Sequence, residues 1–362
     1  MYRKHVYRVI LVAFLLVLSA CSQESAPQTP TPTASGPMEQ AAVTETAVSP
    51  RPTPTTQPTQ TSTALPPTAE PEPTSVPLGG IGVIGDSNSD EYRADDNRGG
   101  EYAAVTLNWI EQLAVSRGLN FGEWGTWDEP RRTGYAYNWS RSGANVHTML
   151  SDGQVDGLAA QIAAGEVAYA IIYIGTNDFS PANGNYAQIY DGSMSDEDVA
   201  WKVNRFVADV ETAVSTLQAA GDVHIILGNV ADPGVLPGIS TLFPKEDGRQ
   251  RVTDTVNALN AALANLATAH DITFVDLQQF ALDLATKIDA DGYLILDGTQ
   301  INMTEGGNNP IYMRLGDNRG HPGTVISGLL ANALVITPLN QLDGVNIPLL
   351  TDTEILANAG LR

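Results

Sequence analysis

The feature that most constrains the fold is a near-continuous apolar run, YAIIYIGTND, at residues 169–178, which ends in small polar residues. A run without alternation predicts a strand covered on both faces, because a half-exposed strand would alternate apolar and polar residues. Similar runs occur at residues 81–87, 224–230 and 272–277, and helix-patterned segments lie between them. This order predicts a parallel α/β sheet with helices on both faces.

The remaining body fits the same scheme. A short strand and turn at 135–143 brings the expected sheet to about five strands. Apolar spacing predicts helices over 104–119, 146–165, 197–220, 250–270, 278–288 and 324–336. In such sheets reactive groups gather at the carboxyl ends of the strands. Polar or small residues follow the expected strands at Asp86-Ser87, Gly143-Ala144, Gly175–Asp178 and Gly228-Asn229.

The first 78 residues are expected to lie outside this fold. Residues 1–21 join a basic start to a short apolar stretch that ends in LSAC, and Cys21 is the only cysteine. This segment resembles the lipobox of bacterial lipoproteins, which implies lipid attachment at Cys21. An ordinary signal peptide or anchor is the alternative. Residues 22–78, rich in Pro, Thr and Ser, predict a disordered stalk.

The composition argues against several function classes. The net charge is −22, which disfavours nucleic acid as a partner, although solubility explains an acidic surface equally simply. Gly80, Gly82 and Gly85 match a dinucleotide fingerprint, but they lie inside the apolar run instead of opening a helix, so no nucleotide cofactor is expected. No metal is expected either, since HExxH is absent and DADGY (289–293) reads as an Asp-Gly turn rather than a calcium loop.

Ser87 is a candidate nucleophile, and a nucleophilic serine needs a base. His224 and His270 adjoin an apolar strand and a helix end, which favours structural roles, whereas His147 follows the Ser142-Gly143 turn. His321 lies in a polar, Gly-rich loop just before a helix, with Asp317 close by. The Gly-x-Ser-x-Gly elbow of α/β-hydrolases does not match, because Ser89 stands where the second glycine would be.

Four short blocks together resemble the GDSL or SGNH hydrolase family. They are GDS (85–87), NWSRSGA (138–144), GTND (175–178) and a histidine followed by proline (321–322), in the family's order. The region they span covers nearly the whole body. The resemblance implies a three-layer α/β/α, flavodoxin-like fold. It also implies an esterase, lipase, carbohydrate deacetylase or acyltransferase that needs no cofactor.

The resemblance also implies residue roles. Ser87 would be the nucleophile and His321 the general base. The oxyanion hole would combine the backbone N–H groups of Ser87 and Gly143 with the side-chain amide of Asn177. Taken singly, Gly143 could be a mere turn residue and Asn177 a helix cap.

The chain departs from the family at the third member of the triad. The family usually has an aspartate three residues before the histidine, where this chain has Asn318, and Asp317 lies four before. We expect Asp317 to partner His321, because a carboxylate stabilises the imidazolium and an amide does not. Asn318, Asp297 or no third member are the alternatives.

The domain scheme is a hydrolase domain over 79–340 and a packed C-terminal extension over 341–362. Trp124, Trp127, Tyr135, Tyr137 and Trp139 precede the expected oxyanion glycine and suit sugar stacking or an acyl pocket, with plain packing as the alternative.

The chain is thus expected to be a lipid-anchored, extracytoplasmic serine ester hydrolase of the cell envelope, acting on small acyl esters such as acetylated glycans or on lipid esters. An O-acyltransferase and a non-catalytic surface binding lipoprotein are the alternatives. The sequence leaves the oligomeric state open.

Overall fold

A parallel sheet forms the centre of the fold. The computed structural model describes residues 78–94, 98–181, 184–235, 242–317 and 320–362, all within the unit Ala69–Arg362. Cys21, nearly all of the expected stalk and Asn318 lie outside the described residues. Within them, the sheet has the order β1-β4-β5-β6, and each neighbouring pair is parallel. The strands are β1 (Gly80–Gly85), β4 (Val167–Tyr173), β5 (His224–Gly228) and β6 (Thr273–Val275).

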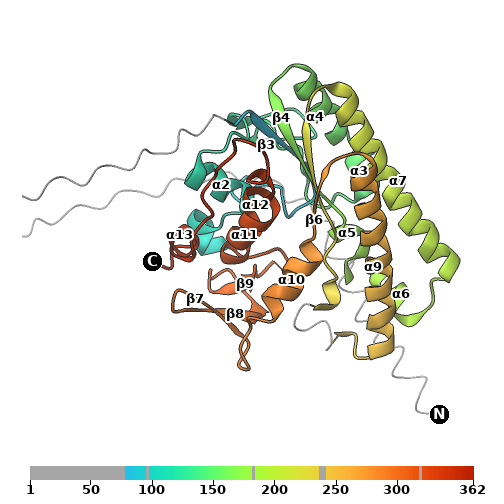
Figure 1. Cartoon of the computed structure of the whole chain (residues 1–362). Coiled ribbons are helices and arrows are strands. Elements are labelled where there is room, and N and C mark those ends of the chain that lie inside the picture. The colour runs from blue at the N-terminus through green and yellow to red at the C-terminus, as the bar shows by residue number, and fades with distance from the viewer. Residues whose placement is uncertain (1–77, 95–97, 182–183, 236–241, 318–319) are drawn as a thin grey trace, which may run out of the picture. The chain divides into compact units, whose positions relative to one another are not determined.

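Helices cover both faces of this sheet, as Figure 1 shows. One face carries α3 (Val146–Ser151), α4 (Gln154–Ala163), α7 (Asp196–Ala220) and α9 (Glu246–Ala269). The other carries α2 (Trp109–Arg117), α11 (Thr324–Ala331), the π-helix η4 (Asn332–Ile336) and α12 (Thr337–Leu339). The expected three-layer α/β/α architecture is therefore confirmed.

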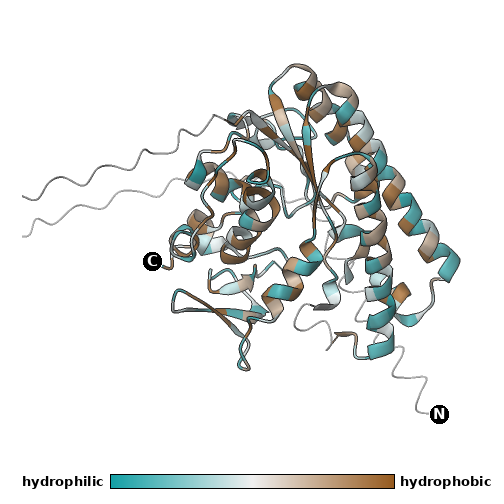
Figure 2. Cartoon of the chain, in the orientation of Figure 1, coloured by the Kyte–Doolittle hydropathy of each residue, from teal (hydrophilic) through white to brown (hydrophobic). Residues whose placement is uncertain are grey.

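The two layers of core explain the unbroken apolar run in β4. Ile171 and Ile172 are both fully buried, but they belong to different hydrophobic clusters. Ile172 packs with the α3, α4, α7 and α9 side, and Ile171 packs with the α2 and α11 side. In Figure 2 much of the central sheet is brown, whereas the long helices α7 and α9 contain many teal, hydrophilic residues. Successive side chains of a strand point to opposite faces, so a strand covered twice has no polar position.

The expected strand at 135–143 is only partly a strand. β3 (Thr133–Tyr135) pairs antiparallel with β2 (Trp124–Thr126), outside the main sheet. The chain then touches β1 through a single parallel bridge between Val83 and Asn138. Val83 N–H donates to Tyr137 O, and Trp139 N–H donates to Val83 O. This bridge takes the place of the fifth strand, because Ser140 to Gly143 turn away toward α3.

Several helix boundaries differ from expectation. The helix expected from residue 104 begins at Trp109, because Asn108 and Glu111 form a capping box; a 3₁₀ turn, η1 (Gly100–Val105), precedes it. The segment 146–165 holds α3 and α4, separated at Gly153. The shorter elements are α5 (Thr176–Phe179), α6 (Asn185–Asp191), η3 (Pro233–Val235) and α10 (Leu277–Ala285).

A small second sheet was not expected from the sequence. It consists of β7 (Tyr293–Leu296), β8 (Thr299–Gly306) and β9 (Tyr312–Arg314). β7 and β8 form an antiparallel hairpin, and β9 adds to β8 in parallel. This insert lies between α10 and the loop that carries His321, so it delivers that loop to the main sheet.

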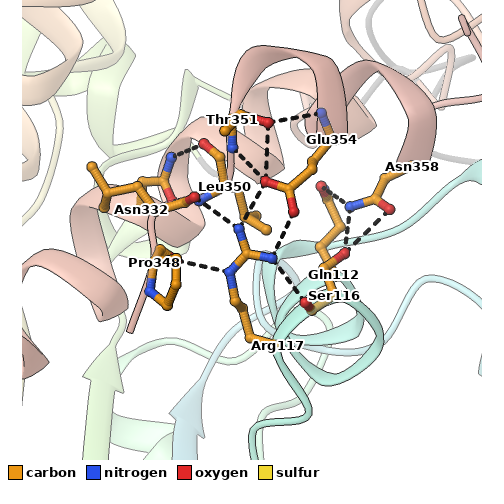
Figure 3. Close-up of polar contacts among 10 residues, drawn as sticks. Gln112, Ser116, Arg117, Asn332, Pro348, Leu350, Thr351, Glu354 and Asn358 are labelled. Carbon is orange, nitrogen blue, oxygen red and sulfur yellow. Dashed lines mark hydrogen bonds and ion pairs between the residues drawn. The ribbon is translucent and has the colours of Figure 1, made fainter. Parts of the chain in front are cut away.

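The C-terminal segment packs against α2 through α13 (Asp352–Asn358), as Figure 3 shows. Both terminal nitrogens of Arg117 donate to the Glu354 carboxylate at 2.8 Å. Arg117 also donates to the carbonyls of Pro348 and Leu349, and Asn358 donates to Ser116 Oγ. These contacts join residues more than 200 positions apart.

Candidate active site

Ser87 follows directly on the end of β1. Asp86 Oδ1 accepts from Asn88 N–H at 2.9 Å, and the Asp86 carbonyl accepts from the N–H groups of Ser89 and Asp90. This tight turn aims the chain away from the sheet and leaves Ser87 only 7 % exposed. Gly85 is required just before it, since a Cβ there would stand 2.3 Å from the carbonyl oxygen of Tyr173 on β4.

His321 reaches Ser87 from the loop between β9 and α11. Its Nε2 lies 2.8 Å from Ser87 Oγ, and its Nδ1 contacts Asp317 Oδ2. An ionised carboxylate can only accept, so Nδ1 carries the proton in this arrangement and Nε2 accepts from the serine hydroxyl. The His321 carbonyl accepts from Leu315 N–H, and the Pro322 carbonyl accepts from the Tyr92 hydroxyl at 3.1 Å. The structure therefore brings Ser87, His321 and Asp317 into one chain of contacts.

The other candidate residues for these positions are occupied elsewhere. Asp297 pairs with Arg362 at 2.8 Å and accepts from the Thr353 hydroxyl. His224 lies 2.9 Å from the Thr273 hydroxyl, His270 contacts Gln218, and His147 lies 3.7 Å from Asp209. Of the histidines in the described part of the chain, only His321 has a recorded contact with Ser87.

Two of the three expected oxyanion residues, Gly143 and Asn177, line a common cleft, whereas Ser87 and His321 are not among its lining residues. Gly143 has φ 87°, a left-handed conformation that favours glycine, and a Cβ there would meet no atom within 4 Å. Asn177, on α5 just after β4, donates through Nδ2 to the Ala144 carbonyl at 2.9 Å. That bond fixes the amide plane and uses one of its two hydrogens, which leaves the other for an oxyanion. Both residues line a cleft of about 660 Å³.

Arg98 links the segments that carry these groups. Its buried guanidinium donates to the Ser87 carbonyl at 2.9 Å and to Ser142 Oγ at 2.7 Å. It also lies 4.8 Å from the centre of the Tyr92 ring, whose hydroxyl reaches Pro322. Arg98 and Tyr92 were not singled out in the sequence, because no spacing distinguishes them from other surface residues. Their burial beside the active loops appears only in the structure.

Buried carboxyl groups surround the site. Burial raises the pKa of Asp86 to about 6, that of Asp178 to about 7 and that of Glu91 to about 8. Asp90, by contrast, is ion-paired with Arg141 at 3.1 Å and accepts from Ser142 N–H at 2.8 Å. The loop before Gly143 is thus held by a charged partner on the loop after Ser87.

The aromatic side chains at 124–139 contact mainly other residues of the same segment. Arg131 lies over the rings of Trp127 and Trp139 at 4.7 and 4.4 Å, and Trp139 Nε1 donates to Gln161. Trp124 meets Tyr135 edge to face at 4.9 Å. No member of the cluster lines the cleft beside Asn177. The aromatic residues that line that cleft are Phe179 of α5 and Phe206 and Trp201 of α7, and Trp201 is the exposed one of the three. None of them was among the candidate residues expected from the sequence.

Residues 78–362, apart from the short gaps, contain neither a metal-binding cluster nor a membrane-spanning helix. No three His, Cys, Asp or Glu side chains gather in a way that could hold a metal ion there. In the DADGY segment, Asp289 accepts from the N–H groups of Asp291 and Tyr293, as a turn carboxylate does. No helix in the same range has the length and apolarity that a bilayer span requires.

Comparison with known families identifies the chain. The model of the GDSL-like lipase/acylhydrolase family matches residues 81–322, more than half of the chain. The chain belongs to this family, and it is an ester hydrolase. The matched range begins in β1 and ends at Pro322, so it contains Ser87, Gly143, Asn177 and His321.

The solved structures that are similar to this chain include an acetylxylan esterase from Geobacillus stearothermophilus. It is 16% identical, with a TM-score of 0.42, and the match covers 74% of this chain and 96% of that one. An extracellular lipase from Streptomyces rimosus is 15% identical, with a TM-score of 0.42, and the match covers 73% and 99% of the two chains. The comparison with curated proteins found no match.

Proposed function

We propose that the protein cleaves small acyl esters, acetylated carbohydrates among them, through an acyl-serine intermediate on Ser87. The observation that carries the proposal is the chain of contacts from Ser87 Oγ through His321 to Asp317. A serine becomes a useful nucleophile only when an oriented base can take its proton. Here His321 is the base, and Asp317 orients its ring.

The reaction runs in two halves. Ser87 Oγ attacks the ester carbonyl while His321 Nε2 takes its proton, and the carbonyl oxygen becomes an oxyanion beside Gly143 and Asn177. The carbon–oxygen bond to the alcohol then breaks, and His321 returns the proton to the leaving oxygen. In the second half, water gives a proton to His321 and attacks the acyl-serine. Collapse of that intermediate releases the carboxylic acid and restores the Ser87 hydroxyl.

The alternatives differ only in what happens at the same serine. If a sugar hydroxyl replaces water in the second half, the protein is an acyltransferase. The non-catalytic binding protein does not fit, because the chain belongs to an acylhydrolase family. The buried position of Ser87 and the intact Nε2–Oγ contact at 2.8 Å favour a working site.

The experiment is labelling of the full chain with a fluorophosphonate, with Ser87→Ala as the matched control. We expect stoichiometric label on the wild type and none on Ser87→Ala. An unlabelled wild type, or equal label on both, overturns the proposal. Product analysis with 4-nitrophenyl acetate, with and without a sugar acceptor, then separates hydrolysis from transfer.

We also propose that Cys21 carries lipid and holds the enzyme at the cell envelope, outside the cytoplasm. The support is the order of a basic start, a short apolar stretch and LSAC at the N-terminus, followed by a Pro- and Thr-rich segment. The ester substrate would then be met at the membrane surface.

A further inference from the structure

The cleft beside the oxyanion residues is larger than a small acyl group needs. It has a volume of about 660 Å³ and starts at Gly143 and Asn177. From there it runs along α7, where Trp201, Lys202 and Arg205 line it. Any substrate whose carbonyl oxygen occupies the oxyanion position has this cleft at its side, so the cleft must receive part of the substrate or stay filled with water.

The lining combines apolar side chains, namely Val146, Phe179 and Phe206, with charged and amide ones, and the charged groups disfavour a long fatty acyl chain. Charged or amide side chains form much of the wall, among them Asp178, Lys202, Arg205 and Asp209. A hydrocarbon tail would remove these groups from water without offering them a hydrogen bond, which costs free energy for each group. The occupant therefore has to carry polar groups of its own.

Trp201 supplies an apolar surface in this polar setting. Its side chain is 63 % exposed, although large aromatic residues are rarely left in water on an outer helix. Within the described residues no aromatic ring or cation stacks on its indole, unlike Trp124, Trp127 and Trp139. A free indole face beside hydrogen-bonding groups suits a flat ligand that is apolar on its faces and polar at its edges.

Two cations, Lys202 and Arg205, line the same cleft as that indole. Arg205 is held by Asp209 at 3.0 Å, which fixes its guanidinium at the cleft wall. Lys202 has no carboxylate within ion-pair distance among the described residues, so its three N–H donors are available. Donors at the rim and an aromatic platform form a combination that matches a pyranose ring with its hydroxyl groups.

We propose that this Trp201 cleft binds the sugar ring of an O-acylated glycan, with the ring stacked on Trp201 and its hydroxyls bonded by Lys202 and Arg205. The inference rests on the proposed function, because it places the sugar next to an ester held at Ser87. It narrows the substrate class to carbohydrate esters rather than lipid esters.

The first test compares two substrates. The full chain and the Trp201→Ala variant are assayed on partially acetylated cello-oligosaccharides and on 4-nitrophenyl acetate, which has no sugar ring. We expect Trp201→Ala to shift the ratio of kcat/KM at least tenfold against the oligosaccharide, and Trp201→Phe to restore most of it. Trp124→Ala is the matched control, since Trp124 is also partly exposed but lies outside the cleft, and it should leave the ratio unchanged. An unchanged ratio in Trp201→Ala overturns the inference.

The second test does not depend on turnover. The Ser87→Ala protein is titrated with the same acetylated oligosaccharides, and binding is followed by tryptophan fluorescence and calorimetry. We expect saturable binding that weakens at least tenfold when Trp201→Ala is added to Ser87→Ala. Equal binding by the two proteins contradicts the cleft assignment, whatever the result of the fluorophosphonate labelling. Conversely, Ser87-dependent hydrolysis of 4-nitrophenyl acetate without oligosaccharide binding upholds the enzyme and refutes the cleft.

Discussion

At the scale of single residues, the triad depends on the contact between Asp317 and His321, which are four positions apart in the sequence. The two side chains touch even though they are one position further apart than is usual in the family. The contact places a carboxylate against Nδ1, where it orients the ring and stabilises the imidazolium formed during attack. The longer spacing in the sequence therefore does not separate Asp317 from His321.

This contact gives a direct prediction for Asp317. We expect Asp317→Ala to lower kcat on 4-nitrophenyl acetate by about 10³- to 10⁴-fold, because the ring loses both its orientation and its counter-charge. Asn318→Ala is the neighbouring control and should lower kcat less than about tenfold. Steady-state kinetics of the two variants decide the matter, and the opposite order would reassign the third member to Asn318.

Asn177 supports a second prediction. Removing one oxyanion donor typically costs about 10²- to 10³-fold in kcat, so we expect Asn177→Ala to show a loss of this size with a smaller change in KM. The variant also loses the bond to the Ala144 carbonyl, which is worth about 0.5–1.5 kcal/mol of stability. Thermal unfolding measured in parallel separates the two effects. A large fall in stability with kcat retained would make Asn177 a structural residue.

At the scale of elements, the strands were predictable and the insert was not. Buried runs such as Ile171-Ile172 have a pattern that packing on both faces enforces, so the sequence located β1, β4, β5 and β6 closely. The β7–β9 sheet has no such signal, because exposed and half-buried residues interrupt its strands. Segment 324–336 was predicted as one helix, yet it is α-helical only to Ala331 and then widens into a π-helix.

The residues of the site also fall into two groups, those that could be located from the sequence and those that could not. Ser87, Gly143, Asn177 and His321 could be located because each stands in a short block after an expected strand or in the final loop. Trp201 could not, since a single tryptophan in a 25-residue amphipathic helix is indistinguishable from a core residue until its exposure is known. Arg98 could not be located either, because a single arginine is ordinarily expected on the protein surface, whereas Arg98 is buried.

The docking of α13 on α2 yields a prediction about pH. Hydrogen bonds from the Arg117 guanidinium, followed by one from Thr351 N–H, lower the pKa of Glu354 to about 2. A depressed carboxyl pKa stabilises the fold above the unfolded value of about 4.5, and this contribution is lost as the pH falls toward 2. We expect Glu354→Gln to cost about 0.5–1 kcal/mol at pH 7 and progressively less at lower pH.

Urea unfolding at several pH values measures this cost. The matched control is Glu129→Gln, which removes an exposed partner of Arg132 at 3.7 Å and should change stability little. A Glu354→Gln deficit that stays constant down to pH 2 would show that the carboxylate charge plays no part in holding α13.

At the scale of the whole molecule, the hydrolase body and the proposed anchor lie in different parts of the sequence. The described members of the two hydrophobic clusters of the body lie between Leu78 and Leu361, and the only cysteine of the chain, Cys21, precedes them. Its stability therefore comes from packing rather than disulfides. The proposed anchor can be changed without touching a core residue.

This separation predicts the outcome of Cys21→Ser. In a bacterial host we expect the wild type to incorporate labelled fatty acid and to partition into the detergent phase, and Cys21→Ser to take up no label. Specific activity on 4-nitrophenyl acetate should be the same in both proteins. Fatty-acid label that persists in Cys21→Ser would place the modification elsewhere, and an unlabelled wild type would refute the anchor.

The hydrogen bond between Ser87 and His321 spans 234 residues of chain. A growing polypeptide presents its serine early but gains its base only after all four strands of the main sheet have been made. A product that ends just before His321 therefore contains β1, β4, β5 and β6 but has no base for Ser87. Turnover thus requires two distant segments of the polypeptide to have met, and it reports that the sheet between them has been synthesised.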